Sequence, residues 1–423
     1  MHTEIRKPED TLWDVAVIGG GPAGMMAAGR AAERGAKVIL LEKNPILGKK
    51  LLITGGGRCN VTNAELDTRK LLDKFKENNK YLFSAFSQWS VKETLDFFHG
   101  RLMETKEEAE KRVFPATNKA ESVWKVLVEY IKKGDVTILS KTEVTGFKKE
   151  RAEITAVILK NKKEIRARSF ILATGGKSHP ETGSTGEGFQ RLRSLGHTVA
   201  EPQASLVPLT LRDEWVKRLA GVSLQNIKIS LFQNDVKQSS VAGKILFTHV
   251  GVSGPTILNL SGEVSELLKY GEVKISLDLF PTLDHGMLNQ ELQDLFKEHS
   301  NKKFKNSLGN LITPALCPAI IELSGIDPET WSNSITREER MTLIALLKNI
   351  SLNVKGLLGV EKAIITSGGV KLDEIDFKTM RSRIVPNLYL VGDVLNIDRP
   401  SGGYSLQLCW TTGFVAGNSV PLK

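Results

Sequence analysis

The stretch Asp14–Gly24 (DVAVIGGGPAG) constrains the fold of this 423-residue chain more than any other segment. A short β-branched run leads into Gly19, Gly21 and Gly24, and an alanine-rich stretch follows over Pro22–Arg34. Strand, G-x-G-x-x-G and helix in this order are typical of a βαβ unit that binds a dinucleotide. The glycines allow a tight turn, close approach of backbone N–H groups to a diphosphate, and close helix–strand packing. We therefore expect a parallel sheet with a dinucleotide at the start of this helix.

An acidic residue after the second expected strand, Lys37–Leu41, supports this interpretation. The residue is Glu42, and it follows Gly24 at nearly the spacing of about 20 residues found in such sites. A carboxylate there accepts hydrogen bonds from a ribose diol and repels a 2′-phosphate. A purely structural glycine turn, the alternative, would not require this acid.

Further glycine-rich segments indicate which dinucleotide is bound. Gly48–Asn63 (GKKLLITGGGRCNVTN) contains a pair of lysines, three consecutive glycines and then arginine, cysteine and asparagine. Ser169–Gly176 (SFILATGG) and Leu388–Asp393 (LYLVGD) look like buried strands that end near glycine, and Ser401–Gln407 (SGGYSLQ) opens a C-terminal helix. A two-ring cofactor that lies extended across a sheet needs backbone close to its ribityl chain and diphosphate at such places. The sequence therefore predicts FAD, with an NAD-only dehydrogenase as the alternative.

The residues expected to contact FAD follow predicted strands or lie in the glycine-rich loops. Basic residues among them suit the diphosphate, and an aspartate is placed to hold a ribityl hydroxyl. They are Gly19, Gly21, Pro22, Ala23, Gly24, Glu42, Lys43, Lys49, Gly57, Arg58, Cys59, Asn60, Val144, Thr174, Gly175, Gly392, Asp393, Gly402, Gly403, Tyr404 and Ser405.

Sequence blocks along nearly the whole chain resemble the bacterial family of NAD(P)/FAD-dependent oxidoreductases, which includes aminoacetone oxidase-like and bile-acid-pathway flavoproteins. The blocks are VIGGGPAG, TGGGRCNVTN, Arg112–Val123 (RVFPATNKAESV), Ala173–Gly188 (ATGGKSHPETGSTGEG), Leu246–Pro255 (LFTHVGVSGP) and Val391–Gln407 (VGDVLNIDRPSGGYSLQ). The resemblance implies an FAD-dependent enzyme with a glutathione-reductase-type fold. The family pattern has Asp-Gly near Asp398 and Asn after Gly-Gly-Tyr, whereas this chain has Arg399-Pro400 and Ser405.

The order of these patterns predicts an α/β fold with an insertion. We expect a three-layer, Rossmann-like FAD-binding domain over residues 1–201 and 366–423, an inserted β-barrel-like domain over 202–283 and 349–365, and a helical subdomain over 284–348. The insertion would be the roof over the isoalloxazine ring, because ligand sites commonly lie between domains.

Local patterns predict the elements inside these domains. Apolar residues at helical spacing predict amphipathic helices over Phe86–Phe98 and Lys119–Lys133. Val136–Phe147 and Ile154–Leu159 are expected to form a strand-rich flap. In the insertion, strands are expected over Leu206–Leu211, Leu224–Phe232, Ile245–Thr248, Glu272–Leu279 and Ser351–Thr366.

Composition agrees with a soluble enzyme of the cytoplasm, and the family resemblance implies a bacterial one. No run approaches the ~20 apolar residues of a membrane-spanning helix, and the first residues, MHTEIRKPED, form no apolar leader. Cys59, Cys317 and Cys409 are too few and too widely spaced for a disulfide framework or a metal site. The net charge of +10 is spread along the chain, so a solvated surface is expected rather than a nucleic-acid site. The alternative is a flavin-bearing RNA-associated or binding protein that uses this basic surface.

The expected chemistry is hydride transfer between flavin N5 and a small or medium organic substrate, by amine oxidation or by reduction of a carbon–carbon double bond. No second G-x-G-x-x-G follows a strand, so NAD(P)H is expected only as a transient electron donor. Cys59 has no neighbouring cysteine in its motif, which argues against a disulfide reductase.

His249 and Tyr404 are the candidate catalytic residues. His249 lies at a strand end before a glycine- and proline-containing turn, where an imidazole can exchange a proton with a substrate; a histidine that only stabilises the turn is the alternative. Tyr404 follows Gly402 and Gly403 and is expected over the flavin edge, or packed within the closing helix. Arg399 is expected to be an exposed loop arginine, with pairing to a substrate carboxylate or flavin O2 as the alternative. The serines and threonines show no order typical of a catalytic triad.

Overall fold

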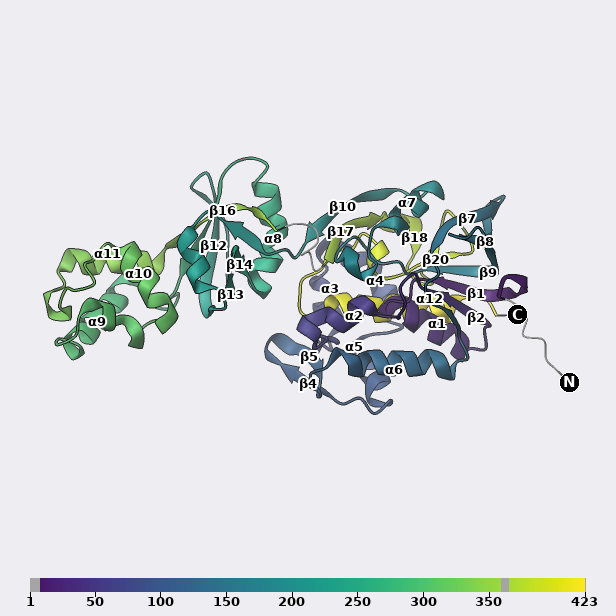
Figure 1. The fold of residues 1–423 in the computed structure, drawn as a ribbon, viewed down its shortest axis with the longest axis horizontal. Helices are drawn as coiled ribbons and strands as arrows, with labels where there is room; N and C mark the ends of the chain where they lie inside the picture. The colour runs from purple at the N-terminus through teal and green to yellow at the C-terminus, as the bar shows by residue number, and fades with distance from the viewer. Residues whose placement is uncertain (1–7, 359–364, 423) are drawn as a thin grey trace. The chain divides into compact units, whose positions relative to one another are not determined.

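The computed structural model describes residues 8–358 and 365–422, which form two compact units (Figure 1). The sheet unit consists of Met1–Ala204 and Ala363–Lys423, and the barrel unit of Ser205–Lys362. Each unit has its own cluster of buried hydrophobic side chains. The predicted fold class, an α/β domain with a barrel-like insertion, is confirmed.

The sheet unit is built around β1 (Leu12–Ile18), which is part of a nine-stranded sheet among the described residues. Parallel to β1 run β2 (Val38–Leu41), β6 (Thr137–Leu139), β9 (Glu164–Leu172) and β20 (Leu388–Leu390). Antiparallel additions are β7 (Val144–Glu150), β8 (Glu153–Leu159), β18 (Ile375–Asp376) and β19 (Arg381–Ser382). The central parallel strands are continuous apolar runs, because helices and loops bury both of their faces.

Two helices pack on α1 (Pro22–Glu33), the helix that follows the glycine turn. They are α6 (Ala120–Lys133) and the C-terminal α12 (Tyr404–Ser419). A Cβ atom on Gly413 would lie 2.5 Å from the carbonyl oxygen of Ala23, and one on Gly417 would lie 2.4 Å from that of Ala27. The helix near the start of the chain, α1, and the C-terminal helix α12 are therefore in close backbone contact.

The other elements of the sheet unit are short. The helices are α2 (Lys49–Ile53), α3 (Thr68–Asp73), α4 (Asn79–Phe86), α5 (Val91–His99) and α7 (Glu187–Ser194). A small sheet joins β3 (Thr62–Asn63), β5 (Arg112–Pro115) and β4 (Thr105–Glu108), and β10 (Val199–Ser205) pairs with β17 (Ile365–Val370). In the sequence, β10 and β17 flank the barrel unit.

The barrel unit is a closed barrel with a helical excursion. Its strands, in order around the barrel, are β11 (Leu209–Leu211), β14 (Gly251–Ser253), β13 (Val236–Thr248), β12 (Ser223–Gln233), β15 (Val273–Asp278) and β16 (Ile350–Leu357). Its helices are α8 (Pro255–Leu267), α9 (His285–Glu298), α10 (Cys317–Ser324) and α11 (Arg337–Lys348). Barrel residues such as Leu277 and helix residues such as Leu292 belong to one hydrophobic core.

Some predicted elements differ from the structure for identifiable reasons. The single helix over Phe86–Phe98 is wrong, because Ser90 and Glu93 form a capping box that starts α5 separately from α4. The strand-rich segment predicted over Val136–Phe147 contains β6, which belongs to the parallel set, and the start of β7, which belongs to an antiparallel hairpin.

Differences also occur in the barrel unit. The strand expected over Leu206–Leu211 begins only at Leu209. The helix α8 was not predicted, because the sequence pattern in this region favoured short strands. A proline after Gly254, at the first turn of α8, was the available signal for this helix. The stretch Ser351–Thr366 crosses residues 359–364, which lie outside the described residues. Within residues 8–358 and 365–422, no helix has the length and apolar character needed to cross a bilayer.

We expect Gly413→Ala to lower the unfolding temperature, because the added methyl group must displace α12 from the backbone of α1. Overpacking of this kind costs about 1–3 kcal/mol. Gly262→Ala in α8 is the matched control, since no other atom lies within 4 Å of its Cβ position. That substitution should be neutral or stabilising by up to about 1 kcal/mol. Thermal melts followed by circular dichroism compare the two; equal stability of Gly413→Ala and wild type would contradict the close packing.

Candidate functional site

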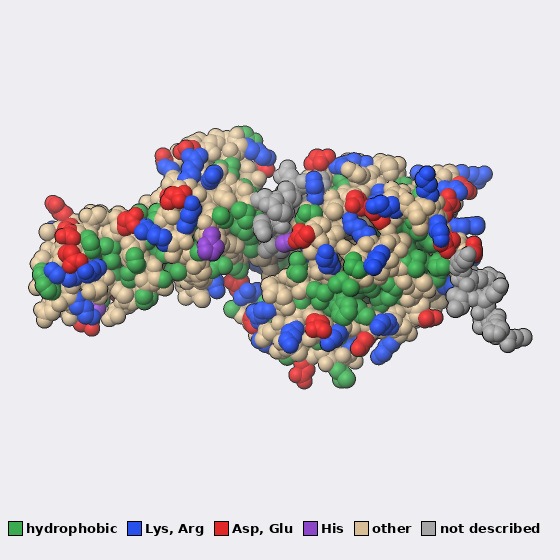
Figure 2. All heavy atoms as spheres, viewed as in Figure 1, with side chains coloured by type: hydrophobic (Ala, Val, Ile, Leu, Met, Phe, Trp, Pro, Cys, Tyr) green, Lys and Arg blue, Asp and Glu red, His purple; other side chains and the backbone are tan. Residues whose placement is uncertain are grey.

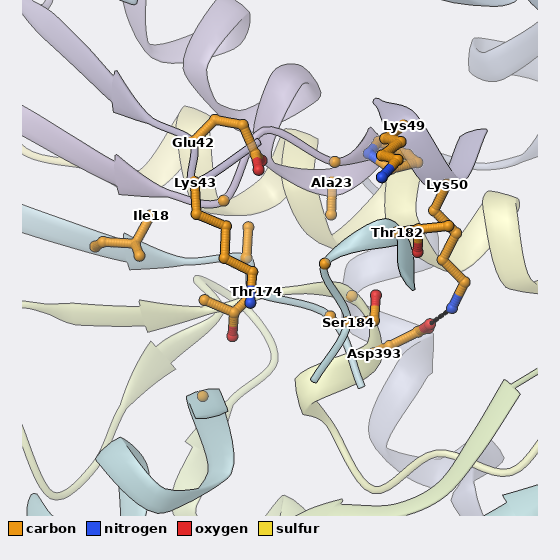
Figure 3. A pocket seen from close by; sticks show the side chains of 18 of the residues that line it. Ile18, Ala23, Glu42, Lys43, Lys49, Lys50, Thr174, Thr182, Ser184 and Asp393 are labelled. Carbon is orange, nitrogen blue, oxygen red and sulfur yellow. Dashed lines mark ion pairs between the residues drawn. The ribbon is translucent and has the colours of Figure 1, made fainter. Parts of the chain in front are cut away.

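A pocket lies at the carboxyl ends of β1, β2 and β9 in the sheet unit (Figure 3). Ile18, Leu41, Ala173 and Val391 line it, each at or just beyond the end of a strand. The first residues of α1, α2 and α7 also line the pocket, which has a cavity volume of about 180 Å³. In open parallel sheets, ligands bind at this edge.

Each glycine of the G-x-G-x-x-G turn has a distinct environment. Gly19 has φ +102°, and a Cβ atom there would lie 2.5 Å from the carbonyl oxygen of Ala173. A Cβ atom on Gly24 would lie 1.9 Å from the carbonyl oxygen of Gly19, so no side chain fits between helix and turn. Gly21 lines the pocket, and no atom lies within 4 Å of its Cβ position. The space beside Gly21 is therefore free for a ligand that approaches the backbone closely.

The Glu42 carboxylate is buried at one end of the pocket. Its Oε2 atom accepts a hydrogen bond from the backbone N–H of Gly20 at 2.7 Å. Its Oε1 atom accepts from the backbone N–H and the side-chain amide of Asn44, at 2.7 and 2.8 Å. A carboxylate has about four acceptor positions, so one remains for a ribose hydroxyl.

A loop between β9 and α7 runs along the pocket, and side chains from the β2–α2 segment hold it there. Lys43 Nζ donates to Thr185 Oγ1 at 2.9 Å and lies 3.0 Å from Glu187 Oε1. Asn44 Nδ2 donates to the carbonyl oxygen of Thr182 at 3.0 Å. Burial raises the pKa of Glu187, but hydrogen bonds from Thr185 and Lys43 outweigh it and lower that pKa to about 2. Glu187 is therefore ionised at neutral pH.

The opposite end of the pocket contains a charged cluster of Lys50, Asp393 and Arg399. Lys50 and Asp393 form an ion pair, marked in Figure 3, in which Nζ lies 3.9 Å from Oδ2. Lys50 Nζ also donates to Ser178 Oγ at 2.6 Å. Arg399 pairs with Asp393 Oδ1 and is itself buried. Burial raises the pKa of Asp393, but the charges of Arg399 and Lys50 outweigh it, so that pKa is below its ordinary value.

The expectation that Arg399 is an exposed loop arginine is wrong, because its side chain is completely buried. Its Nη1 atom donates to the carbonyl oxygen of Ile397 at 2.7 Å, and its Nε atom donates to Ser405 Oγ at 3.0 Å. Arg399 and Ser405 are two of the positions at which the sequence departs from the family pattern. The structure brings them into direct contact, which no sequence spacing indicated.

The pocket wall includes many of the predicted cofactor residues. These are Gly19, Gly21, Pro22, Ala23, Glu42, Lys43, Lys49, Val144, Thr174, Gly175, Gly392, Asp393 and Ser405. The predicted residues that are not part of the wall are Gly24, Gly57, Arg58, Cys59, Asn60, Gly402, Gly403 and Tyr404. Their contribution to cofactor binding stays a prediction.

The TGGGR loop has its own contacts beside the pocket. The Arg58 guanidinium lies 4.1 Å from the ring centre of Phe114 and pairs with Glu108. Cys59 is buried, and burial raises the pKa of its thiol to about 12, so it is not a reactive thiolate. The side-chain oxygen of Asn60 is buried without a hydrogen-bond partner among the described residues.

The two candidate catalytic residues belong to different units. Tyr404 is buried in the sheet unit, with its ring centre 6.0 Å from that of Phe75 in an edge-to-face arrangement. Burial raises the pKa of Tyr404 above its ordinary value. His249 is exposed in the turn between β13 and β14 of the barrel unit. The expectation that both face one flavin ring stays a prediction.

A Ser–His–Glu chain, which the sequence order did not suggest, lies elsewhere in the sheet unit. Ser382 Oγ lies 3.0 Å from His197 Nε2, and His197 Nδ1 lies 2.9 Å from Glu374 Oε2. Ser382 Oγ also accepts hydrogen bonds from the backbone N–H groups of Ile384 and Val385, and it is buried. This serine is a turn-stabilising residue and is not accessible as a nucleophile.

Sequence analysis missed other residues of the pocket wall. Of the adjacent lysines it selected Lys49, whose Nζ donates to the carbonyl oxygen of Glu181, whereas Lys50 reaches the charged cluster. It also missed Thr182, Ser184 and Cys409. Both lysines line the pocket, and only the direction of α2 decides which of them reaches Asp393. The loop and α12 residues carried no signal beyond their neighbouring glycines.

The pocket fits an extended dinucleotide with a second polar end. Thr174 Oγ1 on the pocket wall is buried without a hydrogen-bond partner among the described residues. The free space at Gly21 and the N-terminus of α1 suit a diphosphate, Glu42 suits a ribose, and Asp393 suits a further hydroxyl. FAD has all of these groups. Within residues 8–358 and 365–422, no group of His, Cys, Asp and Glu could hold a metal ion.

This fold and pocket define an FAD-dependent oxidoreductase. Residues 13–419 match the family described as HI0933-like protein Rossmann domain, and the chain belongs to that family. The predicted class of FAD-dependent enzyme is thereby confirmed.

Two relatives match over nearly their full length. The chain is 29% identical to the 3-dehydro-bile acid delta(4,6)-reductase of Clostridium scindens, over 96% of this chain and 98% of the relative. It is 28% identical to the ribosomal RNA dihydrouridine synthase of Escherichia coli, again over 96% and 98%. Among solved structures, 3-ketosteroid-delta4-(5alpha)-dehydrogenase from Rhodococcus jostii aligns with a TM-score of 0.53 and 15% identity, over 99% of this chain and 98% of that chain. This last likeness is one of fold.

We expect Gly21→Val to abolish FAD binding without unfolding the protein. The position has φ −78° and no neighbouring atom, so a Cβ atom is tolerated by the fold but occupies the space of the diphosphate. FAD titration of the apoprotein with a parallel thermal melt measures both effects. Gly262→Ala is the control that should bind FAD normally. Full flavin occupancy in a folded Gly21→Val protein would place the diphosphate elsewhere.

Glu42→Ala should weaken FAD binding by roughly 1.5–3 kcal/mol, the scale of a hydrogen bond to a charged group. The apoprotein should also lose stability, because the N–H of Gly20 would be left without its acceptor. Glu42→Gln keeps an acceptor oxygen and should show a smaller effect on both quantities. Dissociation constants from fluorescence titration provide the comparison, and an unchanged value for Glu42→Ala would show that the carboxylate does not contact FAD.

Proposed function

We propose that this protein reduces a carbon–carbon double bond conjugated to a carbonyl group. The observation that carries this proposal is the near full-length similarity to two relatives whose names describe different molecules but the same type of bond. A delta(4,6)-reductase of a 3-dehydro-bile acid acts on double bonds conjugated to a ketone. A dihydrouridine synthase acts on the double bond of a uracil ring, which is conjugated to a carbonyl group. Of the two predicted reaction types, this similarity favours double-bond reduction over amine oxidation.

The residues of the pocket would hold and orient the cofactor for this reaction. Bound FAD supplies the hydride. Glu42 would hold the ribose, and Gly21 with the start of α1 would hold the diphosphate. The loop that Lys43 and Asn44 fix by hydrogen bonds would form one wall beside the cofactor. Tight binding of NAD(P)H usually requires its own glycine-rich diphosphate loop. In the proposed site the G-x-G-x-x-G turn within Asp14–Gly24 binds FAD, so we propose that NAD(P)H binds weakly and acts as a transient electron donor.

A second candidate substrate is a uridine in RNA. The barrel unit contains equal numbers of basic and acidic residues, so the whole net charge of +10 belongs to the sheet unit, which contains the pocket. Figure 2 shows the basic side chains scattered over the visible face and mixed with acidic ones. Excess positive charge attracts the phosphate backbone, and such binding weakens steeply with salt.

The proposed reaction is tested with protein reduced anaerobically by one equivalent of dithionite. We expect a conjugated enone steroid or an unmodified ribosomal RNA transcript to reoxidise the flavin, and the product to gain two hydrogens by mass spectrometry. The steroid identifies a small-molecule reductase, and the RNA, with salt-sensitive binding, identifies an RNA-modifying enzyme. A saturated steroid and a transcript that already contains dihydrouridine are the matched controls. Substrate-dependent reduction of oxidised flavin by amines, with no reoxidation by either candidate, would contradict the proposal.

We further propose His249 as the proton donor, because its imidazole is exposed and double-bond reduction requires a proton besides the hydride. His249→Ala should slow substrate-dependent reoxidation by about 10²–10⁴-fold while leaving FAD binding unchanged. Stopped-flow absorbance measures the rate. The exposed His285 at the start of α9 provides a matched control variant, His285→Ala, which should react normally. Normal kinetics of His249→Ala would remove His249 from the mechanism.

A further inference from the structure

The charged cluster at the end of the pocket has more positive than negative charge. It contains two cations, Lys50 and Arg399, and one anion, Asp393. The exposed fractions of these side chains are 22%, 0% and 13%, respectively. Water therefore screens this charge only weakly, and any charge that a ligand brings to the pocket end interacts with it strongly.

The contacts show that the two cations share the single buried anion unequally. The Arg399 guanidinium hydrogen-bonds to Ser405, the Ile397 carbonyl group and Asp393. Lys50 forms a longer ion pair with the other oxygen of Asp393, at 3.9 Å, and also feels the charge of Glu181. Lys50 donates a hydrogen bond to the neutral Ser178 Oγ, and it lines the pocket.

Lys50 lies at the end of the pocket where the flavin half of the cofactor is expected. Figure 3 places Glu42 and the Lys50–Asp393 pair on opposite sides of Ala23, the second residue of α1. In folds with this turn, the acidic residue holds the ribose and the helix start holds the diphosphate. The remaining half of an FAD molecule would then extend toward Lys50.

We propose that Lys50 is the counter-charge for the negative charge that bound FAD gains on reduction, and that Arg399 keeps Lys50 available by occupying Asp393. Reduction by two electrons from dithionite, with uptake of one proton, leaves the cofactor with one additional negative charge. The inference rests on the proposed FAD site. Burial lowers the pKa of Lys50, although Asp393 opposes this effect, and a new negative charge in the pocket would favour its protonated form.

The test measures how strongly the protein prefers reduced over oxidised FAD. Dissociation constants of oxidised and reduced FAD are measured for wild type, Lys50→Met and Arg399→Met. The reduction potential of bound FAD, measured against a reference dye, gives the same preference independently. In both variants, we expect the ratio of the dissociation constants of oxidised and reduced FAD to fall about 10–100-fold. This is the effect expected when one charge is removed at a distance of several ångströms. Each tenfold loss corresponds to a potential more negative by about 30 mV. Thermal melts establish that the variants are folded.

Two further variants test whether the effect is specific to Lys50 and whether it requires the positive charge at this position. Lys70→Met removes an exposed cation of the same unit, on α3 and outside the pocket wall, and should leave the preference unchanged. Lys50→Arg should restore most of the preference that Lys50→Met loses. Equal weakening of oxidised and reduced FAD by Lys50→Met, or an equal shift in Lys70→Met, would overturn the proposal. A wild-type protein that binds no FAD would instead overturn the cofactor assignment itself.

Discussion

The structure of the sheet unit depends on close backbone contact around α1. The helix starts against the turn after β1 because Gly24 leaves no room for a side chain below the Gly19 carbonyl group. On its other side, α12 reaches the backbone of α1 at Gly413 and Gly417. These contacts fix where the helix N-terminus points, and they bring the C-terminal segment with Asp393 and Ser405 to the same pocket. Segments from both ends of the chain thus complete one site.

The two ends of the pocket contain different polar groups. At one end, the Glu42 carboxylate is oriented by backbone N–H groups, so it is placed before any ligand arrives. At the other end, Asp393 is held by Arg399 and faces Lys50. A hydroxyl group that donates a hydrogen bond suits the carboxylate at the first end, and a negative charge suits the second end. This asymmetry matches a cofactor whose two halves differ, and it links the binding site to redox chemistry.

The barrel unit contributes differently. Its strands close on themselves and share one hydrophobic core with α9, α10 and α11, so the unit has the features of an independent folding body. Its charge is balanced, whereas the sheet unit carries the excess positive charge. Any contribution of this unit to catalysis depends on residues such as His249, which is exposed on a hairpin turn rather than buried in the core.

Sequence by itself determined the elements whose signals are local. The glycine turn, the buried parallel strands, Glu42 and the family were all predictable, because strand periodicity, glycine geometry and motif spacing are properties of consecutive residues. The capping box that divides α4 from α5 was also local, although the apolar spacing on both sides concealed it.

Tertiary structure alone decided which polar side chains share the pocket. Lys50 rather than Lys49 reaches Asp393 because of the direction in which α2 leaves its turn. Arg399 can be buried because Asp393 neutralises its charge and Ser405 and a backbone carbonyl group accept hydrogen bonds from it. Burial of a charge depends on partners distant in space, and no spacing along the chain encodes that distance.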